Sequence, residues 1–420
     1  MRFSLPLLTA LLLAPLAVLH AADASRPNIL FIIADDLGWG DLRCYGNPVI
    51  DTPTLDGLAK AGVRFTDHYS PSSLCAPARA GFLTGRYNHR TGAVDVPSNR
   101  GLDRLDLSEK TFGDYFRHAG YATALIGKWH NGAYSQDYLP NRRGFDLFFG
   151  FPNGGQDYWK WNLLRNDAAV THDGRYLTDA LNDEAIRFIR DQKAKPFALF
   201  LAHHAPHSPL QAPEPLVQKY RERLGKDASE AVALTYAMIE AMDAGLGRLF
   251  AALRDEGRWE NTIVVFTSDN GPVLRRDATH GPQRRFNGPF SGEKESVLEG
   301  GLRVPAIVAW PAGFPGGRVV ATPVHGCDWL PTLLAAAGAG VMGFMGLAAG
   351  PLRSSPTAAG AASRDRPPPA GSRRAVRAIP ARRSPRGSRA PRPADAPRAT
   401  ASPWGAGSRR APRAWWCGRS

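Results

Sequence analysis

The chain has 420 residues, enough for one large folded domain or for a large and a small one. Its 52 Lys and Arg outnumber its 38 Asp and Glu, which gives a formal net charge of +14. Residues 351–420 hold 16 Arg, no Lys and two Asp, so this segment alone carries 16 − 2 = +14, and residues 1–350 are balanced. The basic total therefore does not indicate a specific nucleic-acid partner for the folded part.

Residues 1–22 have the pattern of a secretory signal peptide. Arg2 precedes an apolar run that ends in small residues, and this run is too short to span a membrane. We find no later apolar segment long enough to do so, and expect an exported chain that is periplasmic or secreted. The few, scattered cysteines do not predict a disulfide framework, although a single bridge stays open. They are Cys44, Cys75, Cys327 and Cys417.

Residues 27–338 alternate between apolar runs and amphipathic stretches. The apolar runs have the length and composition of buried parallel strands. They are residues 28–34, 121–127, 196–202, 262–268 and 304–310. The stretches between them predict helices over residues 53–62, 108–119, 178–192, 228–257 and 328–337. This alternation predicts an α/β fold with a doubly wound, mostly parallel central sheet and helices on both faces.

The composition changes after about residue 340. Among residues 351–420, the total number of Leu, Ile, Val and Phe residues is three, and Arg, Pro, Ala, Ser and Gly are abundant. We interpret residues 339–420 as a low-complexity, disordered tail, because it buries too little apolar surface to offset chain entropy. An out-of-frame reading of a GC-rich gene is our preferred explanation, and a functional Arg-rich arm is the alternative.

Oxygen-bearing side chains directly follow two of the predicted strands. Asp35 and Asp36 come after the first strand, and Asp269 and Asn270 follow the strand over 262–268. Ligands in such folds bind beyond the carboxyl ends of strands, and adjacent buried carboxylates repel one another unless a cation lies between them. An oxygen set suits Ca²⁺ or Mg²⁺ better than Zn²⁺. Asp-Asn-Gly is also common in turns, but the two pairs together favour a metal site.

The stretch CAPARAGFLTG, residues 75–85, places a cysteine before a predicted helix. Pro77 suits the first turn of a helix, so Cys75 is expected at a helix N-terminus, which favours an anion. We interpret Cys75 as an activated nucleophile that faces an anionic substrate beside a metal. The alternative is a small buried side chain that only packs.

This stretch resembles the signature of the type I, formylglycine-dependent sulfatases of the alkaline phosphatase superfamily. Ala78 stands where that family usually has Ser or Thr. Further motifs of the family occur in the same order: NILFIIADDLGWGD at 28–41, GKWH at 127–130, APHSP at 205–209, TSDNG at 267–271 and GEKESVLEGGLRVP at 292–305. The resemblance covers residues 27–338, which we interpret as an arylsulfatase-like catalytic domain.

The resemblance implies a cofactor and a modified residue. In such sulfatases a separate maturation enzyme, formylglycine-generating or anaerobic, oxidises the signature cysteine to Cα-formylglycine. One hydroxyl of the hydrated aldehyde attacks sulfur, and the second lets the sulfate leave. One Ca²⁺ per chain, with Mg²⁺ less favoured, would be bound by Asp35, Asp36, the modified Cys75, Asp269 and Asn270.

The motifs also imply catalytic roles for side chains. These are Cys75, Arg79, Lys128, His130, His207 and Lys294. Arg79 would orient the hydrated aldehyde, which Lys128 and His130 would flank, with His130 the partner of the second hydroxyl. His207 and Lys294 would hold the sulfate oxygens and protonate the leaving alcohol. The preceding His203 and His204 are also typical of zinc clusters, but we set this aside because the other metal ligands are oxygens.

The implied reaction is hydrolysis of a sulfate ester, on a carbohydrate rather than on a small aryl alcohol. The loop over 153–162 offers aromatic faces for sugar rings. Alternatives are a phosphoesterase or phosphonate hydrolase of the same superfamily, or a catalytically impaired product of a truncated gene. The family normally continues after residue 338 into a small antiparallel subdomain, which residues 340–420 do not resemble. We therefore expect this subdomain to be truncated or missing.

Overall fold

The computed structural model describes residues 26–193 and 195–339. They lie within the first of two compact units, Met1–Leu352. The predicted signal peptide, the tail and the missing subdomain fall outside the described residues and stay predictions. Within the described ranges, no helix has both the length and the apolar character needed to cross a membrane.

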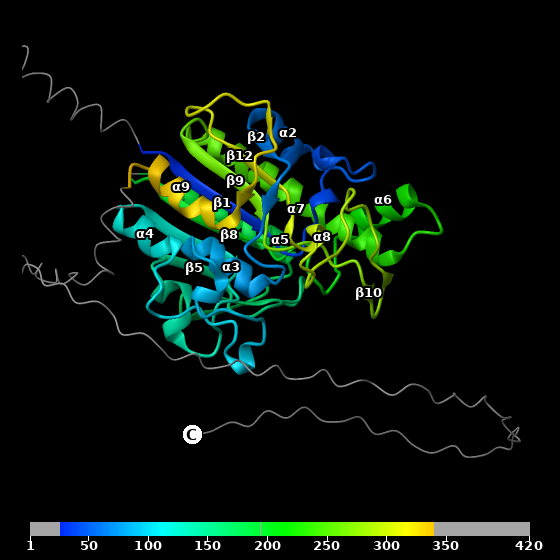
Figure 1. The fold of residues 1–420 in the computed structure, drawn as a ribbon, viewed down its shortest axis with the longest axis horizontal. Helices are drawn as coiled ribbons and strands as arrows, with labels where there is room; N and C mark the ends of the chain where they lie inside the picture. Colours follow the sequence, from blue (N-terminus) through cyan, green and yellow to red (C-terminus); the bar gives the residue numbers. More distant parts are fainter. Residues whose placement is uncertain (1–25, 194, 340–420) are drawn as a thin grey trace, which may run out of the picture. The chain divides into compact units, whose positions relative to one another are not determined.

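A ten-stranded mixed sheet forms the centre of the described region (Figure 1). Its spatial order is β13 (Arg318–Val320), β2 (Val63–Phe65), β12 (Ala306–Ala309), β9 (Thr262–Ser268), β1 (Asn28–Ala34), β8 (Phe197–Ala202), β4 (Ala122–Lys128), β5 (Leu147–Phe151), β6 (Asn162–Arg165) and β7 (Ala168–Thr171). The five strands from β9 to β5 pair in parallel. β12 and β6 pair antiparallel to them at either side.

Helices cover both faces of the sheet, which is why β1, β4, β8 and β9 are buried along their whole length. Leu30 and Ile32 of β1 face one hydrophobic cluster, and Ile29, Phe31 and Ile33 face the other. The first cluster includes α2 (Pro53–Ala61), α5 (Leu177–Asp191), α6 (Glu214–Leu224) and α7 (Glu230–Asp255). The second includes α3 (Cys75–Thr84), α4 (Phe112–His118) and α9 (Trp329–Ala336).

Shorter elements complete the described fold. β10 (Arg276–Asp277) and β11 (Gly281–Pro282) form a hairpin, and β3 (His68–Tyr69) pairs with β14 (Val324–His325). The helix α8 spans Glu299–Leu302. The 3₁₀ turns are η1 (Trp39–Asp41), η2 (Arg43–Tyr45), η3 (Asn88–Arg90), η4 (Ser98–Arg100), η5 (Gln136–Tyr138), η6 (Pro140–Arg142) and η7 (Gly326–Asp328).

The predicted fold class and the predicted helices and strands are confirmed, with one wrong direction. β12 pairs antiparallel with β9, although its apolar run was expected to be a parallel strand. An apolar run reports burial on both faces and carries no information on strand direction. β5, the helix α6 and the short strands at both ends of the sheet were not predicted. The end strands β6, β7 and β13 are partly exposed, which leaves a weaker apolar pattern in their sequence.

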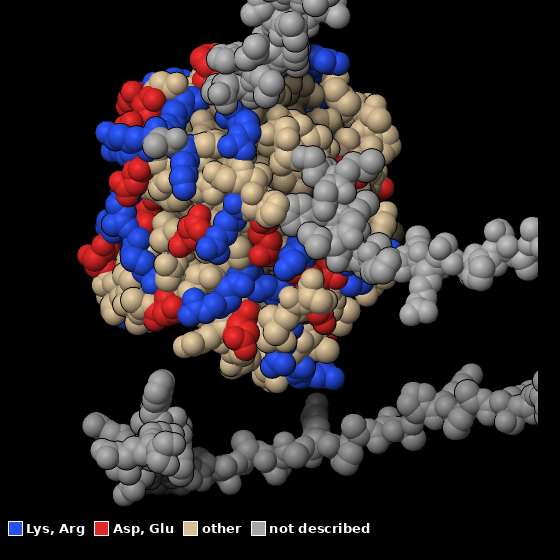
Figure 2. Space-filling model, turned by 90° about the vertical axis from the view of Figure 1, so that its left-hand side faces the viewer, with Lys and Arg blue, Asp and Glu red and all other residues tan. Residues whose placement is uncertain are grey.

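Charge on the visible surface is mixed. Figure 2 shows basic and acidic side chains interspersed over one face, as expected from the balance of residues 1–350.

Candidate active site

The candidate residues gather at the carboxyl ends of neighbouring strands. Asp35 and Asp36 follow β1, Asp269 and Asn270 follow β9, and Lys128 ends β4. Because these strands run parallel in the middle of the sheet, their ends share one edge. The Asp36 amide therefore donates to Asp269 Oδ1, 3.2 Å away, across 233 positions of sequence.

Three buried carboxylates form the core of the site. Oxygens of Asp35, Asp36 and Asp269 lie within 4.8 Å of one another. Asp35 Oδ1 and Asn270 Oδ1 are buried and have no hydrogen-bond donor among the described residues. A buried acceptor without a donor costs free energy, and a hard cation would satisfy both oxygens. The residues present therefore fit the calcium site that the resemblance implies.

Each carboxylate also has a buried cationic neighbour. Lys128 Nζ lies 2.7 Å from Asp35 Oδ2, and Lys294 Nζ lies 2.7 Å from Asp36 Oδ1. The Arg79 guanidinium donates through Nε to Asp269 Oδ2 at 2.9 Å. Such charge-assisted bonds hold the side chains in one arrangement.

The carboxylates differ in how easily they ionise. Burial opposes the charge of Asp35, but Lys128, His207 and Arg79 hold its pKa well below the usual range. Burial and the charge of Asp35 raise the pKa of Asp269 to about 7. A cation bound between these carboxylates would oppose this rise and favour the ionised form of Asp269.

Cys75 is the first residue of α3, at the helix N-terminus as predicted. Its side chain is buried, and burial raises the pKa of the thiol despite the nearby Lys128 and Lys294. Desolvation thus opposes ionisation of this thiol more than the two lysines favour it. The unmodified thiol would be a poor nucleophile at neutral pH.

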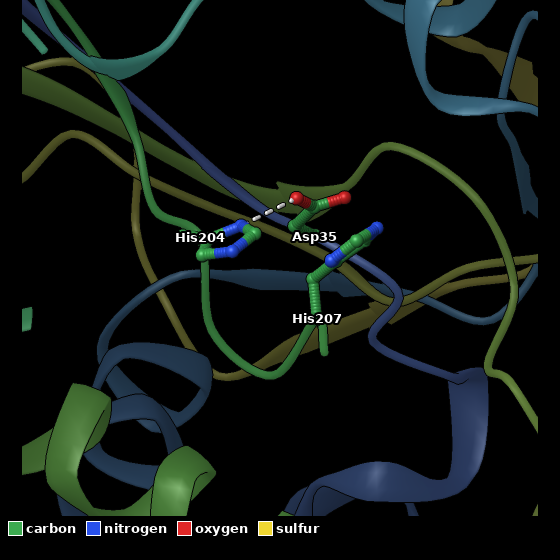
Figure 3. Close-up of side chains that lie close together, drawn as sticks. All are labelled: Asp35, His204 and His207. Carbon is green, nitrogen blue, oxygen red and sulfur yellow. Dashed lines mark hydrogen bonds and ion pairs between the residues drawn. The ribbon is translucent and has the colours of Figure 1, made fainter. Parts of the chain in front are cut away.

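His204 joins the site, although the sequence analysis set it aside. Its Nδ1 lies 3.1 Å from Asp35 Oδ2, and its Nε2 faces the main chain of Gln156. His207 lies nearby, with Nε2 3.8 Å from Asp36 Oδ2, and Figure 3 shows both imidazoles beside the Asp35 carboxylate. Its position in the sequence could have indicated this role, because His204 comes two residues after the end of β8 and therefore lies at the same edge of the sheet.

The two histidines offer a second candidate metal cluster with Asp35. Both ring nitrogens of His204 already lie within hydrogen-bond distance of other groups, Nδ1 of Asp35 and Nε2 of the Gln156 main chain. The carboxylate cluster, with two unsatisfied oxygens beside it, is therefore the better cation site.

His130 follows β4 in a left-handed conformation, with φ of 54°. Its Nε2 lies 3.3 Å from the Val96 carbonyl, and its Nδ1 has no partner among the described residues. Burial and the charge of Lys128 hold the pKa of His130 well below its usual range. The imidazole is therefore favoured in its neutral form, with Nδ1 open to a hydrogen bond from a ligand.

A polar cavity of about 200 Å³ opens beside these side chains. Asp36, His207 and Lys294 contribute to its wall. The other lining residues come mainly from α7 and the segment around the β10–β11 hairpin; they are Pro206, Ser208, Thr235, Val273, Arg275, Arg276, Asp277, Ala278, Gln283 and Arg285. The aromatic side chains of the loop over 153–162 do not line it, and Tyr158 and Trp161 are buried in the core.

The sulfatase family model matches residues 27–339. The chain belongs to the sulfatase family. Human arylsulfatase A is 38% identical over 348 residues, covering 76% of this chain and 65% of that protein. The N-acetylgalactosamine-6-sulfatase of Canis lupus familiaris is 36% identical over 344 residues, covering 74% and 62%. This chain therefore spans less than two thirds of the length of either relative.

Solved structures of this family share the fold. The crystal structure of Ps i-CgsB in complex with k-i-k-neocarrahexaose superimposes with a TM-score of 0.71 at 34% identity, covering 77% of this chain and 74% of that one. The PsFucS1 sulfatase from Pseudoalteromonas sp. has a TM-score of 0.61 at 29% identity, with coverage of 78% and 70%. The sulfatase motifs found in the sequence thus meet at one edge of the sheet, and their individual roles are proposals.

Proposed function

We propose that this chain hydrolyses a sulfate ester, with Cys75 as the nucleophile after its conversion to formylglycine and with Ca²⁺ as the bound cation. The observation that carries this proposal is the convergence of Cys75, three buried carboxylates and three buried cations at the carboxyl edge of the sheet. The family membership supports it.

Asp35, Asp36, Asp269, Asn270 and the modified Cys75 would hold the cation. When bound, Ca²⁺ supplies positive charge that favours the ionised nucleophile and polarises the sulfate. The buried oxygens of Asp35 and Asn270 without donors support this ligand set. Formylglycine supplies two geminal hydroxyls, one for attack on sulfur and one for release of the sulfate.

Arg79, Lys128 and Lys294 would fix the charges around the reacting group. Arg79 lies four residues after Cys75 on α3, so the two share a helix face. Its guanidinium is held by Asp269 and by the Lys128 carbonyl, 3.0 Å from Nη1. Positive groups placed before the reaction stabilise charge that develops on sulfate oxygens.

His207 is our candidate for the general acid. Asp36 outweighs burial and raises the pKa of Lys294, which suits a side chain that stays protonated and holds a sulfate oxygen. Burial lowers the pKa of His207, and an anionic ester bound beside it would raise this pKa again. His207 could then give a proton to the leaving alcohol, while His130 would take one from the nucleophile.

We propose a sulfated carbohydrate as the substrate, with an aryl sulfate as the alternative. The resemblance to N-acetylgalactosamine-6-sulfatase and to Ps i-CgsB, which was crystallised with k-i-k-neocarrahexaose, supports the carbohydrate. The resemblance to arylsulfatase A keeps the aryl ester open. The proposal also requires a formylglycine-generating or anaerobic maturation enzyme as a partner, and the sequence of residues 1–22 supports export to the periplasm or beyond.

The test combines peptide mass and kinetics. The chain would be coexpressed with a maturation enzyme, and the tryptic peptide containing position 75 should have the mass of formylglycine. The purified chain should hydrolyse 4-nitrophenyl sulfate far faster than 4-nitrophenyl phosphate, and Cys75→Ala should abolish turnover while keeping the fold. Full activity in Cys75→Ala, or a preference for the phosphate ester, would overturn the proposal.

A further inference from the structure

Four basic side chains, one lysine and three arginines, line the cavity beside the catalytic residues. Three of them form ion pairs with acidic side chains, and the fourth forms none with the residues that the structure describes. Lys294 pairs with Asp36. Arg275 makes two bonds with Glu295, at 2.8 and 2.9 Å. Arg285 makes two with Asp41, both at 2.7 Å. The fourth, Arg276, pairs with no acidic side chain in the described part of the chain, so its charge is available to a ligand.

The backbone that carries Arg276 is held in place. Arg276 belongs to β10, opposite Pro282 of β11. Asp277 Oδ1 accepts bonds from the amides of Thr279 and His280, at 2.9 and 2.7 Å, which closes the turn of the hairpin. The His280 carbonyl accepts from the Ala231 amide at the start of α7, at 3.2 Å. The hairpin therefore fixes the main chain of Arg276 at the wall of the cavity, and its exposed side chain contributes to the lining.

A second polar group without a partner lines the same cavity. Gln283 is buried, and its side-chain amide makes no hydrogen bond with the described residues. Its amide atoms are not among the fully buried polar atoms without a partner, so they remain accessible from the cavity. A ligand that fills the cavity can therefore accept a hydrogen bond from this amide.

Resting on the proposed function, we propose that Arg276 and Gln283 form a subsite for a second anionic group, a sulfate or a carboxylate, on the carbohydrate whose ester is cleaved. A guanidinium matches the paired oxygens of either group, and the amide N–H of Gln283 can donate to them as well. The same cavity is lined by His207 and Lys294, so one substrate can reach both sets of residues. The structure thus favours polyanionic glycans over singly charged esters.

Kinetics with Arg276→Ala test this subsite. The substrates are a disulfated disaccharide, a disaccharide with one sulfate and one uronate carboxylate, and a neutral disaccharide with one sulfate. We expect Arg276→Ala to raise KM about tenfold for a doubly charged substrate, the usual scale for losing a charged hydrogen bond. KM for the singly charged one should change by less than about twofold. The doubly charged substrate whose KM rises shows whether the second anionic group is a sulfate or a carboxylate.

Arg284→Ala is the matched control, because Arg284 is an exposed arginine of the same segment that does not line the cavity. It removes the same charge and should leave all three substrates nearly unaffected. If Arg284→Ala raised KM for the doubly charged substrates as much as Arg276→Ala, the effect would be long-range attraction by positive charge. That outcome would overturn the subsite. Unchanged KM in Arg276→Ala for both doubly charged substrates would do the same.

A binding measurement separates this inference from the reaction itself. Absence of turnover on every sulfate ester would count against the proposed function. Calorimetry with Cys75→Ala would then decide the subsite, with the three disaccharides as probes. The subsite is supported if Cys75→Ala binds a doubly charged disaccharide more tightly than the singly charged one and if adding Arg276→Ala removes this difference. Equal affinity of Cys75→Ala for all three disaccharides refutes the subsite.

Discussion

Asp35 is contacted by Lys128 and His204 and lies 3.7 Å from Arg79, yet one of its oxygens still has no hydrogen-bond donor among the described residues. At the scale of the residue, the buried cations of the site therefore leave one carboxylate oxygen of Asp35 open to a further cation. A cation there would also oppose the rise in the pKa of Asp269 that burial and Asp35 cause.

Asp35→Asn should therefore cut turnover by orders of magnitude and weaken stabilisation by calcium. A cation bound only by the folded state stabilises the wild type by about 2.7 kcal/mol at a hundredfold excess over Kd. Thermal midpoints with and without Ca²⁺ measure this directly. Asp137→Asn, at an exposed aspartate of η5, is the control. An unchanged wild-type rate after exhaustive chelation would contradict the metal site.

Backbone strain also concentrates at the site. Of the four described non-glycine residues with positive φ, three lie at or next to candidate residues; these are Asp36, His130 and Glu295, at 64°, 54° and 76°. Such conformations cost energy and persist where the surroundings enforce them. The ring of His130 lies close to Gly154, where a Cβ would be only 2.7 Å from His130 Cε1.

Gly154→Ala should displace the His130 ring and lower kcat about tenfold or more, the usual scale for losing general acid–base catalysis. The loss of stability should be no more than about 1–3 kcal/mol, as for other overpacking changes. Gly155→Ala is a matched control, since its Cβ would meet His207 Cε1 at an ordinary 3.9 Å. Steady-state kinetics on an aryl sulfate compare the two. If both variants keep the wild-type rate, the position of His130 is not critical.

At the scale of the element, α7 holds α2 against the sheet. Asp243 of α7 accepts bonds from the Thr54 and Leu55 amides, at 3.0 and 2.8 Å, in the first turn of α2. The N-cap residue of α2, Thr52, makes no side-chain capping bond itself. A distant carboxylate thus satisfies the orphan amides of this helix.

Asp243→Ala should destabilise the chain by about 1–2 kcal/mol, the range for losing a helix cap, because two buried amides lose their acceptor. Urea unfolding measures this change. Asp255→Ala, which removes an exposed carboxylate at the other end of the same helix, should have little effect. Equal midpoints for the two variants would show that the cap does not contribute.

His68 links β3 to α9 and makes the fold sensitive to acid. Its Nε2 accepts from Trp329 Nε1 at 2.9 Å, so a proton added there would face another donor. Burial lowers the pKa of His68 to about 3, against 6.5 when exposed. The pKa of His68 is lower in the folded chain than in the unfolded chain. The contribution of neutral His68 to the free energy of unfolding is therefore fully present above pH 6.5 and is lost as the pH falls towards 3.

The free energy of unfolding should accordingly fall by up to about 1.4 kcal/mol per pH unit below pH 6.5 from this group. His68→Gln keeps an acceptor for Trp329 but does not titrate, so its stability should decline less steeply. Urea midpoints between pH 7 and pH 4.5 compare the two chains. Parallel declines would mean that His68 does not contribute.

At the scale of the whole molecule, the net charge is divided unevenly. Residues 351–420 carry +14 and lie outside the described residues, whereas the balance of residues 1–350 is seen in the mixed surface of Figure 2. Non-specific binding of the full chain to long polyanions such as DNA should therefore depend on residues 351–420.

Deleting residues 351–420 should abolish non-specific binding to double-stranded DNA. The full chain should bind DNA with an affinity that falls steeply with salt, because its arginines displace counterions. Fluorescence anisotropy at several salt concentrations measures this, and activity on a small aryl sulfate serves as the control. If the truncated chain still bound DNA, the basic residues responsible for this binding would lie in residues 1–350.

The sequence by itself determined β1, β4, β8, β9, β12 and the long helices, because apolar periodicity depends on neighbours only a few residues away. It also located Asp35, Asp36, Asp269 and Asn270 together, since parallel strands bring their carboxyl ends to one edge. Only the tertiary structure decided the direction of β12, the contact of His204 with Asp35, and the raised pKa of the Cys75 thiol. It also decided that Arg275 and Arg285 are paired while Arg276 is free among the described residues. These properties depend on burial and on partners far away in the sequence, which no local pattern specifies.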